Sequence, residues 1–237
     1  MTAGSAGGRR LPKAYVSWSS GKDSAFALWE ARRAGDLEVA GLLTTVTETF
    51  ARVSMHGVRE ELLTLQASAV GLPLLTVPIP SPCPNDVYER AMAGALARLR
   101  REGVSRMVFG DLFLEDVRAY REQRLRGTGI DPVFPLWGRP TDRLAREMID
   151  AGLDARLVAL DPRQLPPSFA GRRFDRQLLA DLPPTVDPCG ERGEFHTCVV
   201  AGPMFTAPIA VEPGPVVARD GFVFADLAPA GLNRASR

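Results

Sequence analysis

The sequence predicts an α/β protein, in which a Rossmann-like parallel sheet is followed by a smaller C-terminal α+β region. From residue 13 to about residue 128, short apolar stretches rich in β-forming residues alternate with segments of helical period. After residue 128, proline interrupts shorter elements repeatedly. The 237 residues, 45% of them apolar, can bury a substantial core. We therefore expect a flexible tail at residues 1–12 and two domains, at residues 13–128 and 129–237.

In the first region, the periodicity predicts strands and helices in alternation. Strands are expected at residues 15–18, 39–45, 74–79 and 107–109. Helices are expected at residues 24–34, 58–70 and 85–102, each followed by a glycine. The apolar face of the second helix is expected at Val58, Leu62, Leu65 and Ala69. Because βαβ crossovers are right-handed, this order predicts a parallel sheet covered by helices on both faces.

The second region has weaker signals. A strand is expected near Val133-Phe134, a helix over residues 142–151 and a strand over residues 156–160. Near the end of the chain, two short β-rich stretches flank Asp220-Gly221, a dipeptide that favours the turn of a β-hairpin. These shorter elements predict an α+β domain beside the parallel sheet.

Charge and cysteine content argue against several classes of function. Lysine plus arginine number 29 and aspartate plus glutamate 28, so no field of one sign indicates a nucleic-acid partner or an anionic membrane. The three cysteines form no C-x-x-C pair, which is typical of a reduced cytoplasmic protein. The longest uncharged run, residues 62–85, is broken by prolines, so no membrane helix is expected. We expect a cytoplasmic protein with neither a membrane nor a nucleic-acid partner.

The most informative segment is Ser19-Ser20-Gly21-Lys22-Asp23-Ser24, between the first expected strand and the first expected helix. Small residues let a backbone turn tightly around an anion, and a helix start adds unpaired N–H donors. The serines supply hydroxyl donors, Lys22 a positive charge, and Asp23 a carboxylate suited to Mg2+ or to a helix cap. The segment therefore predicts a pyrophosphate cradle.

Other phosphate-binding motifs do not fit this segment. A Walker P-loop needs glycine where Val16 stands and serine or threonine where Asp23 stands. The G-x-G-x-x-G fingerprint of dinucleotide sites is also absent from the sequence. The remaining alternative is an ordinary turn in which Asp23 or Ser24 caps the helix.

Six short segments occur in a fixed order along the chain. They are Trp18-Ser19-Ser20-Gly21-Lys22-Asp23-Ser24, His56-Gly57-Val58, Gln66-Ala67, Gly110-Asp111, Pro135-Leu136-Trp137-Gly138 and Cys189-Gly190-Glu191-Arg192-Gly193-Glu194-Phe195-His196-Thr197. From Tyr15 to about Phe205 the chain thereby resembles the diphthine-ammonia ligase family, also called the diphthamide synthase ATP-binding domain. Ser20 replaces the first glycine of the S-G-G-x-D-S loop of that superfamily, the PP-loop ATP pyrophosphatases or adenine nucleotide alpha-hydrolases. The resemblance implies a HUP-type Rossmann-like fold.

The resemblance also implies a chemistry. ATP is cleaved between its α and β phosphates with the help of Mg2+, a carboxylate is activated as an acyl-adenylate, and an amine displaces AMP. In the best-known members the acid is diphthine and the amine is ammonia. Those members carry a segment close to E-G-G-E-Y-E-T where this chain has residues 191–197, a variant that resembles bacterial members. The departure falls in the half of the site that would recognise the acyl substrate.

Roles are expected at the following residues. Nucleotide contacts are expected at Ser19, Ser20, Gly21, Lys22, Asp23, Ser24, His56 and Gly110, with Asp23 as the Mg2+ ligand. Substrate contacts are expected at Trp137, Gly138, Glu191, Glu194 and Thr197. Catalytic roles are expected at Lys22, Asp23, Asp111, Glu194 and His196, because acids and a histidine can hold a metal or move a proton.

Each assignment outside the loop has an alternative. Asp111 follows the fourth strand at the edge where open α/β sheets bind ligands, but it could simply cap the next turn. His56 and Trp137 could be structural residues. The segment from Cys189 to Cys198 could be a glycine turn entering a strand, or a zinc site, although this spacing matches no common zinc finger.

The function expected from the sequence is an ATP-dependent, AMP-forming ligase that joins a small or protein-borne carboxylate to ammonia or an amine. Lys22 and the loop amides would stabilise the leaving pyrophosphate. Two alternatives remain open at this stage: a module that binds ATP or AMP without catalysis, and an RNA-thiolation enzyme of the same superfamily. The oligomeric state is also open, with a homodimer as one alternative.

Overall fold

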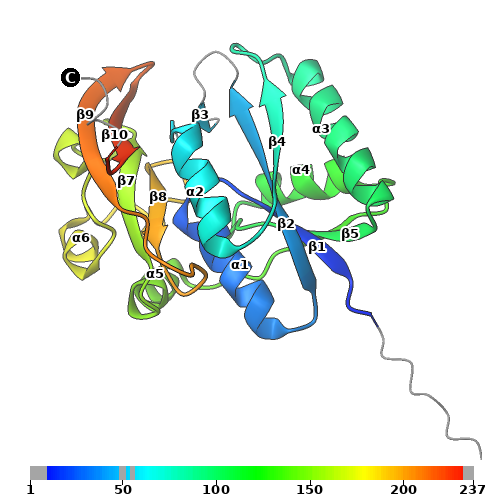
Figure 1. Cartoon of the computed structure of the whole chain (residues 1–237). Coiled ribbons are helices and arrows are strands. Elements are labelled where there is room, and N and C mark those ends of the chain that lie inside the picture. Colours follow the sequence, from blue (N-terminus) through cyan, green and yellow to red (C-terminus); the bar gives the residue numbers. More distant parts are fainter. Residues whose placement is uncertain (1–9, 48–51, 54–56, 232–237) are drawn as a thin grey trace, which may run out of the picture.

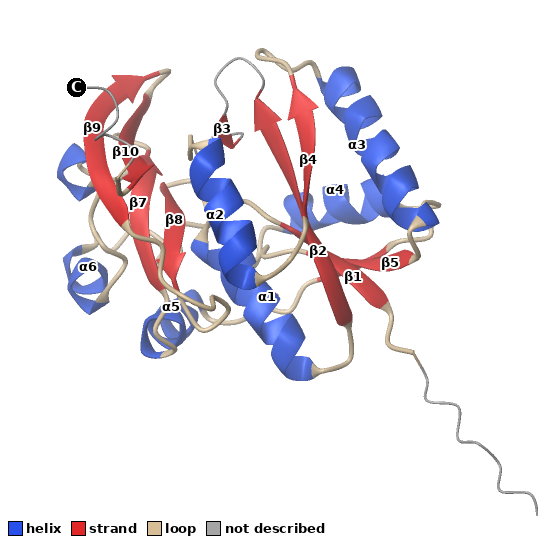
Figure 2. Cartoon of the chain, in the orientation of Figure 1, coloured by secondary structure: helices blue, strands red, loops and turns tan. Residues whose placement is uncertain are grey.

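The computed structural model describes residues 10–47, 52–53 and 57–231. These residues form two β-sheets that share one hydrophobic core, with helices packed on them (Figures 1 and 2). Within the described part of the chain, no helix has the length and hydrophobicity needed to cross a bilayer. The predicted α/β class, with a Rossmann-like sheet and a further β-containing region, is confirmed.

The first sheet contains five parallel strands in the order β4-β2-β1-β5-β6. Their bounds are β1 Lys13–Ser17, β2 Glu38–Thr47, β4 Leu74–Ile79, β5 Val104–Val108 and β6 Asp131–Val133. A sixth strand, β3 (Arg52–Val53), runs antiparallel to the end of β2. The end of β2 pairs with β4 along one edge and with β3 along the opposite edge. Because β1 pairs with that opposite edge earlier in β2, β3 lies on the same side as β1, beyond the end of β1. The carboxyl ends of β1, β2 and β5 thus meet at one edge of the sheet.

Helices cover both faces of this sheet, as the alternation of elements predicts. The bounds are α1 Lys22–Ala34, α2 Glu60–Val70, α3 Asn85–Arg101 and α4 Glu115–Leu125. Successive residues of a strand point to opposite faces. Ala14 and Val16 of β1 accordingly pack with α1 and α2, whereas Tyr15 packs with α3 and α4. The loops that leave β1 and β5 therefore lie between the two layers of helices.

The second sheet is antiparallel, in the order β8-β7-β10-β9. Its strands are β7 Asp154–Leu160, β8 Phe195–Ala201, β9 Val211–Arg219 and β10 Phe222–Pro229, accompanied by α5 Thr141–Asp150, the 3-10 turn Pro167–Phe169 and α6 Arg176–Asp181. At the predicted hairpin between β9 and β10, Asp220 and Gly221 have φ values of 52° and 81°. Both lie in the left-handed region that a type I′ turn requires, so the hairpin prediction is confirmed.

Helix α2 connects the two sheets. The Arg59 guanidinium, just before α2, pairs with the Asp226 carboxylate of β10 at 2.6 Å. At the other end of the helix, the Thr206 backbone N–H donates to the Ala69 carbonyl at 2.7 Å. The main core cluster contains residues from both sheets, so the two regions bury their apolar surfaces against each other.

Two expectations from the sequence are wrong. The strand near Val133 belongs to the first sheet, where β6 pairs with β5 in parallel, because the outer edge of β5 has backbone groups that need partners. The chain therefore leaves the first sheet after residue 133, beyond the boundary expected at residue 128. On α2, Leu65 is 39% exposed, because the helix instead buries Leu62, Leu63 and Gln66.

Candidate active site

The segment Ser19–Ser24 forms a tight loop after β1 and continues into the first turn of α1. Ser20 is fully buried and has a φ of 68°, the left-handed region that favours glycine. It occupies the position at which the S-G-G-x-D-S loop has its first glycine. The hydroxyls of Ser19 and Ser24 are 3.1 Å apart, and the Ser24 hydroxyl donates to the Gly21 carbonyl at 3.0 Å. Gly21 is the N-cap of α1 without a side-chain cap, so the capping roles considered for Asp23 and Ser24 are wrong.

Gly110 holds the loop after β5 against the start of α1. A Cβ at this position would lie 2.7 Å from the Asp23 carbonyl carbon and 2.7 Å from the Ser24 nitrogen. Real Cβ atoms do not approach backbone this closely. Glycine is therefore required here by the close approach of two backbone segments at the carboxyl edge of the sheet.

Strand β8 supplies partners to the backbone of the loop. The Val199 N–H donates to the Ser20 carbonyl at 3.0 Å. The Lys22 N–H, in the first turn of α1, donates to the Thr197 hydroxyl at 3.0 Å. First-turn N–H groups have no acceptor within their own helix, so Thr197 satisfies one of them. Thr197, expected to contact substrate, thus braces the loop in this structure.

The Lys22 side chain, only 2% exposed, points toward the C-terminal region. Its ammonium donates to both carboxylate oxygens of Asp23, at 2.9 and 2.8 Å, and to the Cys189 carbonyl. It also lies 5.6 Å from the centre of the Phe174 ring and 5.5 Å from that of Phe195. Burial acts to lower the pKa of Lys22, but the Asp23 carboxylate and the other acids nearby hold that pKa above its usual value. The ammonium stays charged where the two halves of the site meet.

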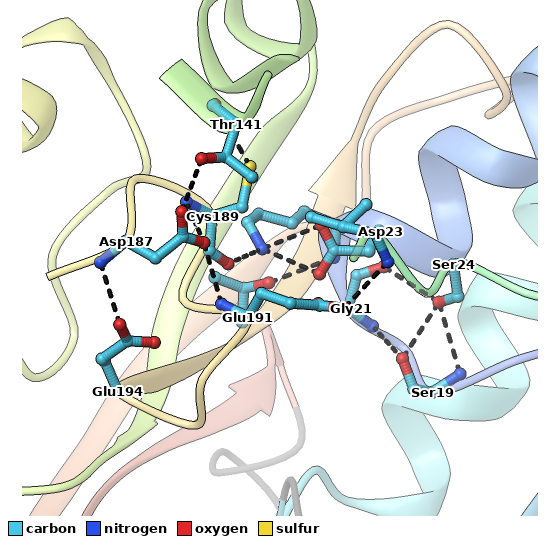
Figure 3. A network of polar contacts seen from close by, with 12 residues as sticks. Ser19, Gly21, Asp23, Ser24, Thr141, Asp187, Cys189, Glu191 and Glu194 are labelled. Carbon is cyan, nitrogen blue, oxygen red and sulfur yellow. Dashed lines mark hydrogen bonds and ion pairs between the residues drawn. The ribbon is translucent and has the colours of Figure 1, made fainter. Parts of the chain in front are cut away.

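The acidic segment before β8 is organised largely by its own backbone (Figure 3). The fully buried Glu194 carboxylate accepts from the Asp187 N–H and from the Arg192 N–H, both at 2.9 Å. The Asp187 carboxylate accepts from the N–H groups of Cys189 and Glu191, at 3.2 and 3.0 Å. Glu194, expected to be catalytic, therefore directs its charge into its own loop. Asp187 has an equal part in this loop, although no motif in the sequence singles it out.

Glu191 reaches from this segment to the first sheet. Its carboxylate accepts from the Leu112 N–H at 2.8 Å (Glu191 in Figure 3). Burial and the neighbouring Asp23 carboxylate raise the pKa of Glu191 to about 7, although the Leu112 hydrogen bond opposes that shift. Glu191 is thus the described acid of the site whose charge changes near neutral pH.

Asp111 and Arg121 form an incompletely paired group beside the loop. The Arg121 Nε and the Asp111 Oδ2 are 3.5 Å apart, and within the described residues neither atom has a hydrogen-bond partner. Burial raises the pKa of Asp111, and the positive charge of Arg121 opposes that shift. Buried polar atoms without partners are uncommon, and a ligand or water would satisfy them.

A cavity of about 1040 Å3 opens at the carboxyl edge of the first sheet, between the sheet, α3 and α4. It reaches the phosphate loop at Ser19 and is bounded there by Thr45 of β2 and Tyr88 of α3. The charged lining residues are four arginines and one glutamate, which favours an anionic ligand. The volume is at the upper end of the range typical of small-molecule sites.

The other residues expected to have a role in the site lie in different surroundings. Burial, together with the charge of Lys22, lowers the pKa of His196 to about 4, so its imidazole is neutral near pH 7 and a weak proton acceptor. The half-buried Trp137 ring stacks under the Arg118 guanidinium at 4.8 Å, away from the cavity lining. The Gly138 N–H donates to the Leu112 carbonyl at 2.8 Å, next to the N–H that binds Glu191. His56 lies outside the described residues.

Comparison with known families covers both regions of the chain. The family model of the diphthamide synthase N-terminal domain matches residues 12–132, and that of the C-terminal domain matches residues 140–221. The chain belongs to the diphthamide synthase family. It is also similar to the proteins named diphthine-ammonia ligase of Bos taurus and of Homo sapiens. Each is 25% identical over 233 residues, which cover 89% of this chain and 86% of the relative.

The two diphthamide synthase domains divide the site between them. The N-terminal domain contains the phosphate loop, the cavity and Gly110, whereas the C-terminal domain contains Asp187, Glu191 and β8. The boundary between the matches falls between β6 and α5, which is where the chain leaves the first sheet. Each domain therefore supplies one wall of the polar cluster around Lys22.

Gln66 is a residue of the N-terminal domain to which the sequence assigned no role in the site. It is fully buried on α2. Its side-chain amide donates to the Ser20 carbonyl at 3.1 Å and to the Val199 carbonyl at 2.7 Å, and its oxygen accepts from the Trp18 indole at 2.9 Å. The available signal was a polar residue on the apolar face of an amphipathic helix, together with its place in one of the family segments.

The donor atoms fit Mg2+ better than zinc. No group of three or more His, Cys, Asp or Glu side chains able to hold a metal ion occurs in residues 10–47, 52–53 and 57–231. Cys189 and Cys198 are both buried, and the described residues around them do not supply the further ligands that a tetrahedral zinc site needs. Mg2+ is usually held by one or two carboxylates together with substrate phosphates, and the partly exposed carboxylate of Asp23 suits that arrangement.

Proposed function

We propose that this protein is an ATP-dependent, AMP-forming ligase that adenylates a carboxylate and transfers the acyl group to ammonia or an amine. The observation that carries the proposal is the strand-loop-helix segment Ser19–Ser24, whose backbone turns at the mouth of an arginine-lined cavity of about 1040 Å3. The second observation is the acidic segment of the C-terminal domain, which faces the same loop from the other side. Membership of the diphthamide synthase family supports the ligase class.

The cavity is the proposed site of the nucleoside, and the loop that of the phosphates. Ser19 lies at the boundary between the two, and the first turn of α1 adds N–H donors and a partial positive charge. The arginines of the cavity lining attract the anion. The incompletely paired Asp111 and Arg121 are then available to polar atoms of the bound nucleotide.

In the first chemical step, a carboxylate oxygen of the acid attacks the α-phosphorus of ATP and pyrophosphate leaves. Lys22 supplies a buried positive charge close to the loop, where it offsets the charge of the leaving group. Asp23 is the residue proposed to hold Mg2+, which neutralises phosphate charge when it is bound. No other metal ligand is assigned.

In the second step, the amine nitrogen attacks the acyl carbon, AMP leaves, and the nitrogen loses a proton. Glu191 is the residue proposed to take up this proton, because its carboxylate bridges both domains through its hydrogen bond to the Leu112 N–H. The neutral imidazole of His196 is assigned a hydrogen-bonding role, because its low pKa makes it a poor base. The relatives are named for diphthine and ammonia, and we propose ammonia as the first amine to test.

The acid is proposed only as a class. Within the variant segment, Phe195 packs against the Lys22 ammonium, and Arg192 lies over the Phe113 ring at 5.5 Å. Phe195 and Lys22 are buried, so Arg192 and Phe113 form the accessible cationic and aromatic border, which suits a carboxylate carried on a small molecule or on a protein. Diphthine itself is one acid to include among the candidates.

The test is ATP-pyrophosphate exchange with a panel of carboxylic acids, with Lys22→Ala as the diagnostic variant. Removing one preorganised charge typically lowers turnover by about a hundredfold or more. Lys13→Ala is the matched control, because Lys13 is the other lysine of the chain and its ammonium contacts only the carbonyl of Glu102 among the contacts described here. Exchange in Lys22→Ala at the wild-type rate would overturn the assignment. Binding of ATP without exchange on any acid would instead identify a non-catalytic nucleotide-binding module.

A further inference from the structure

The phosphate loop contains a strained residue whose conformation is held from outside the loop. Ser20 has a φ of 68°, a conformation that carries strain for any residue with a Cβ. A residue stays in such a conformation only where its surroundings fix it. The Ser20 carbonyl accepts two hydrogen bonds, from the Gln66 side-chain amide at 3.1 Å and from the Val199 N–H at 3.0 Å. The restraint therefore comes from α2 and from β8.

Gln66 forms hydrogen bonds with all three parts of this arrangement. Its oxygen accepts from the Trp18 indole just before the loop, and its nitrogen donates to Ser20 in the loop and to the Val199 carbonyl in β8. Both ends of the amide are thus satisfied, which fixes its orientation. Because the side chain is fully buried, water cannot replace a lost donor without access to the core.

We propose that Gln66 is a positioning residue that holds Ser20 in its left-handed conformation and thereby keeps the phosphate loop ready for ATP. It acts through Ser20 and is assigned no contact with ATP. This inference rests on the proposed ATP site, but its core claim concerns the shape of the loop and is testable without any ligand.

The test combines Gln66→Met with Ser20→Gly. Methionine keeps the volume and loses both amide donors, so Ser20 relaxes toward the ordinary φ range and the loop amides move. We expect ATP to bind roughly tenfold more weakly to Gln66→Met, the factor for about 1.4 kcal/mol of lost hydrogen bonding. Glycine adopts the left-handed conformation without steric strain. Adding Ser20→Gly is therefore expected to recover at least about threefold of that affinity.

Two controls separate positioning from general stability. The melting temperature of Gln66→Met is expected to fall, and Ser20→Gly is not expected to restore it, because glycine adds chain entropy to the unfolded state. Arg59→Ala removes another link between α2 and the second sheet, the ion pair with Asp226, without touching the loop. It is expected to lower the melting temperature and to leave ATP affinity within twofold of wild type.

Hydrogen-deuterium exchange of the ligand-free protein gives the independent readout. Peptides that cover Ser19–Ser24 should exchange faster in Gln66→Met, return toward wild type in the double variant, and remain unchanged in Arg59→Ala. Unchanged exchange in Gln66→Met, or further acceleration on adding Ser20→Gly, would overturn the inference. If the wild-type protein fails to bind ATP while the exchange pattern follows this expectation, the proposed function fails and the positioning role stands.

Discussion

Gly110→Ala tests whether the close approach at the carboxyl edge of the sheet shapes the phosphate loop. The added Cβ would lie 2.7 Å from the Asp23 carbonyl carbon and the Ser24 nitrogen, whereas ordinary contacts begin at 3.4 Å. One of the two backbone segments must therefore retreat by about 0.7 Å, and neither is a flexible side chain. Overpacking of this kind costs about 1–3 kcal/mol, which lowers the melting temperature of a protein of this size by between about 2 and 12 °C.

The same displacement moves the first turn of α1, so ligand binding should suffer as well. A misplacement approaching 1 Å in a positioning element can reduce catalytic efficiency by about a hundredfold, and we expect ATP affinity to fall by at least about tenfold. The assays are thermal unfolding and isothermal titration with ATP and Mg2+. Gly94→Ala is a control for thermal unfolding alone, because Gly94 lines the cavity; its Cβ in α3 meets nothing within 4 Å and should raise stability by up to about 1 kcal/mol. A Gly110→Ala protein that melts and binds ATP like wild type would refute the reasoning.

Three further predictions concern the ionisable groups. The pKa of Glu191 in the folded protein is raised to about 7. As pH rises from about 4.5 to 7, the wild type should therefore lose about 1–3 kcal/mol of stability relative to Glu191→Gln, as measured by urea titration. Parallel pH profiles of the unfolding free energy for the two proteins would contradict this. Hydrogen bonds from Arg163 are the main cause of the lowered pKa of Asp161. Above about pH 4 the Asp161 carboxylate should therefore stabilise the wild type by about 1 kcal/mol relative to Asp161→Asn, and this advantage should vanish on further acidification. Persistence of the advantage in acid would contradict the assignment. Of the three thiols, only the half-buried Cys83 should react rapidly with a disulfide reagent, because Cys189 and Cys198 are buried with raised pKa values; a second fast thiol would show that the core opens.

Local patterns were sufficient to predict most of the first sheet. Each of its helices lies between two strands in sequence and ends near a glycine, so the period change and the turn residue both mark the boundary. The Asp220-Gly221 hairpin was predictable for the same reason, since its two strands are joined directly. Pairing over longer separations left no local signal. β6 was therefore assigned to the wrong region, and the two-residue strand β3 was not predicted.

The candidate site shows the same division between local and distant signals. The loop residues are adjacent in sequence, and their spacing predicted a tight turn. Spacing could not predict that Lys22 would point to Cys189, or that the Glu194 carboxylate would be used by its own loop. Those outcomes depend on contacts between residues far apart in the chain, and on competition among several acids for the same N–H groups. For Gln66, the only signal in the sequence was a polar residue on the apolar face of a helix.

The register of β8 explains why the loop and the second sheet form one functional unit. Strand β8 pairs with β7 along one edge, and on its other edge the backbone groups of Val199 bind the Ser20 carbonyl and the Gln66 amide. An unpaired strand edge invites association with other chains, and here the phosphate loop and α2 cover it. A shift of β8 by one residue would turn these groups toward β7 and would carry the Thr197 hydroxyl away from the Lys22 N–H. The pairing of β7 with β8 in the C-terminal domain therefore sets the backbone geometry of the loop in the N-terminal domain. Any substitution that shifts this register should change nucleotide binding, even where it lies far from the cavity.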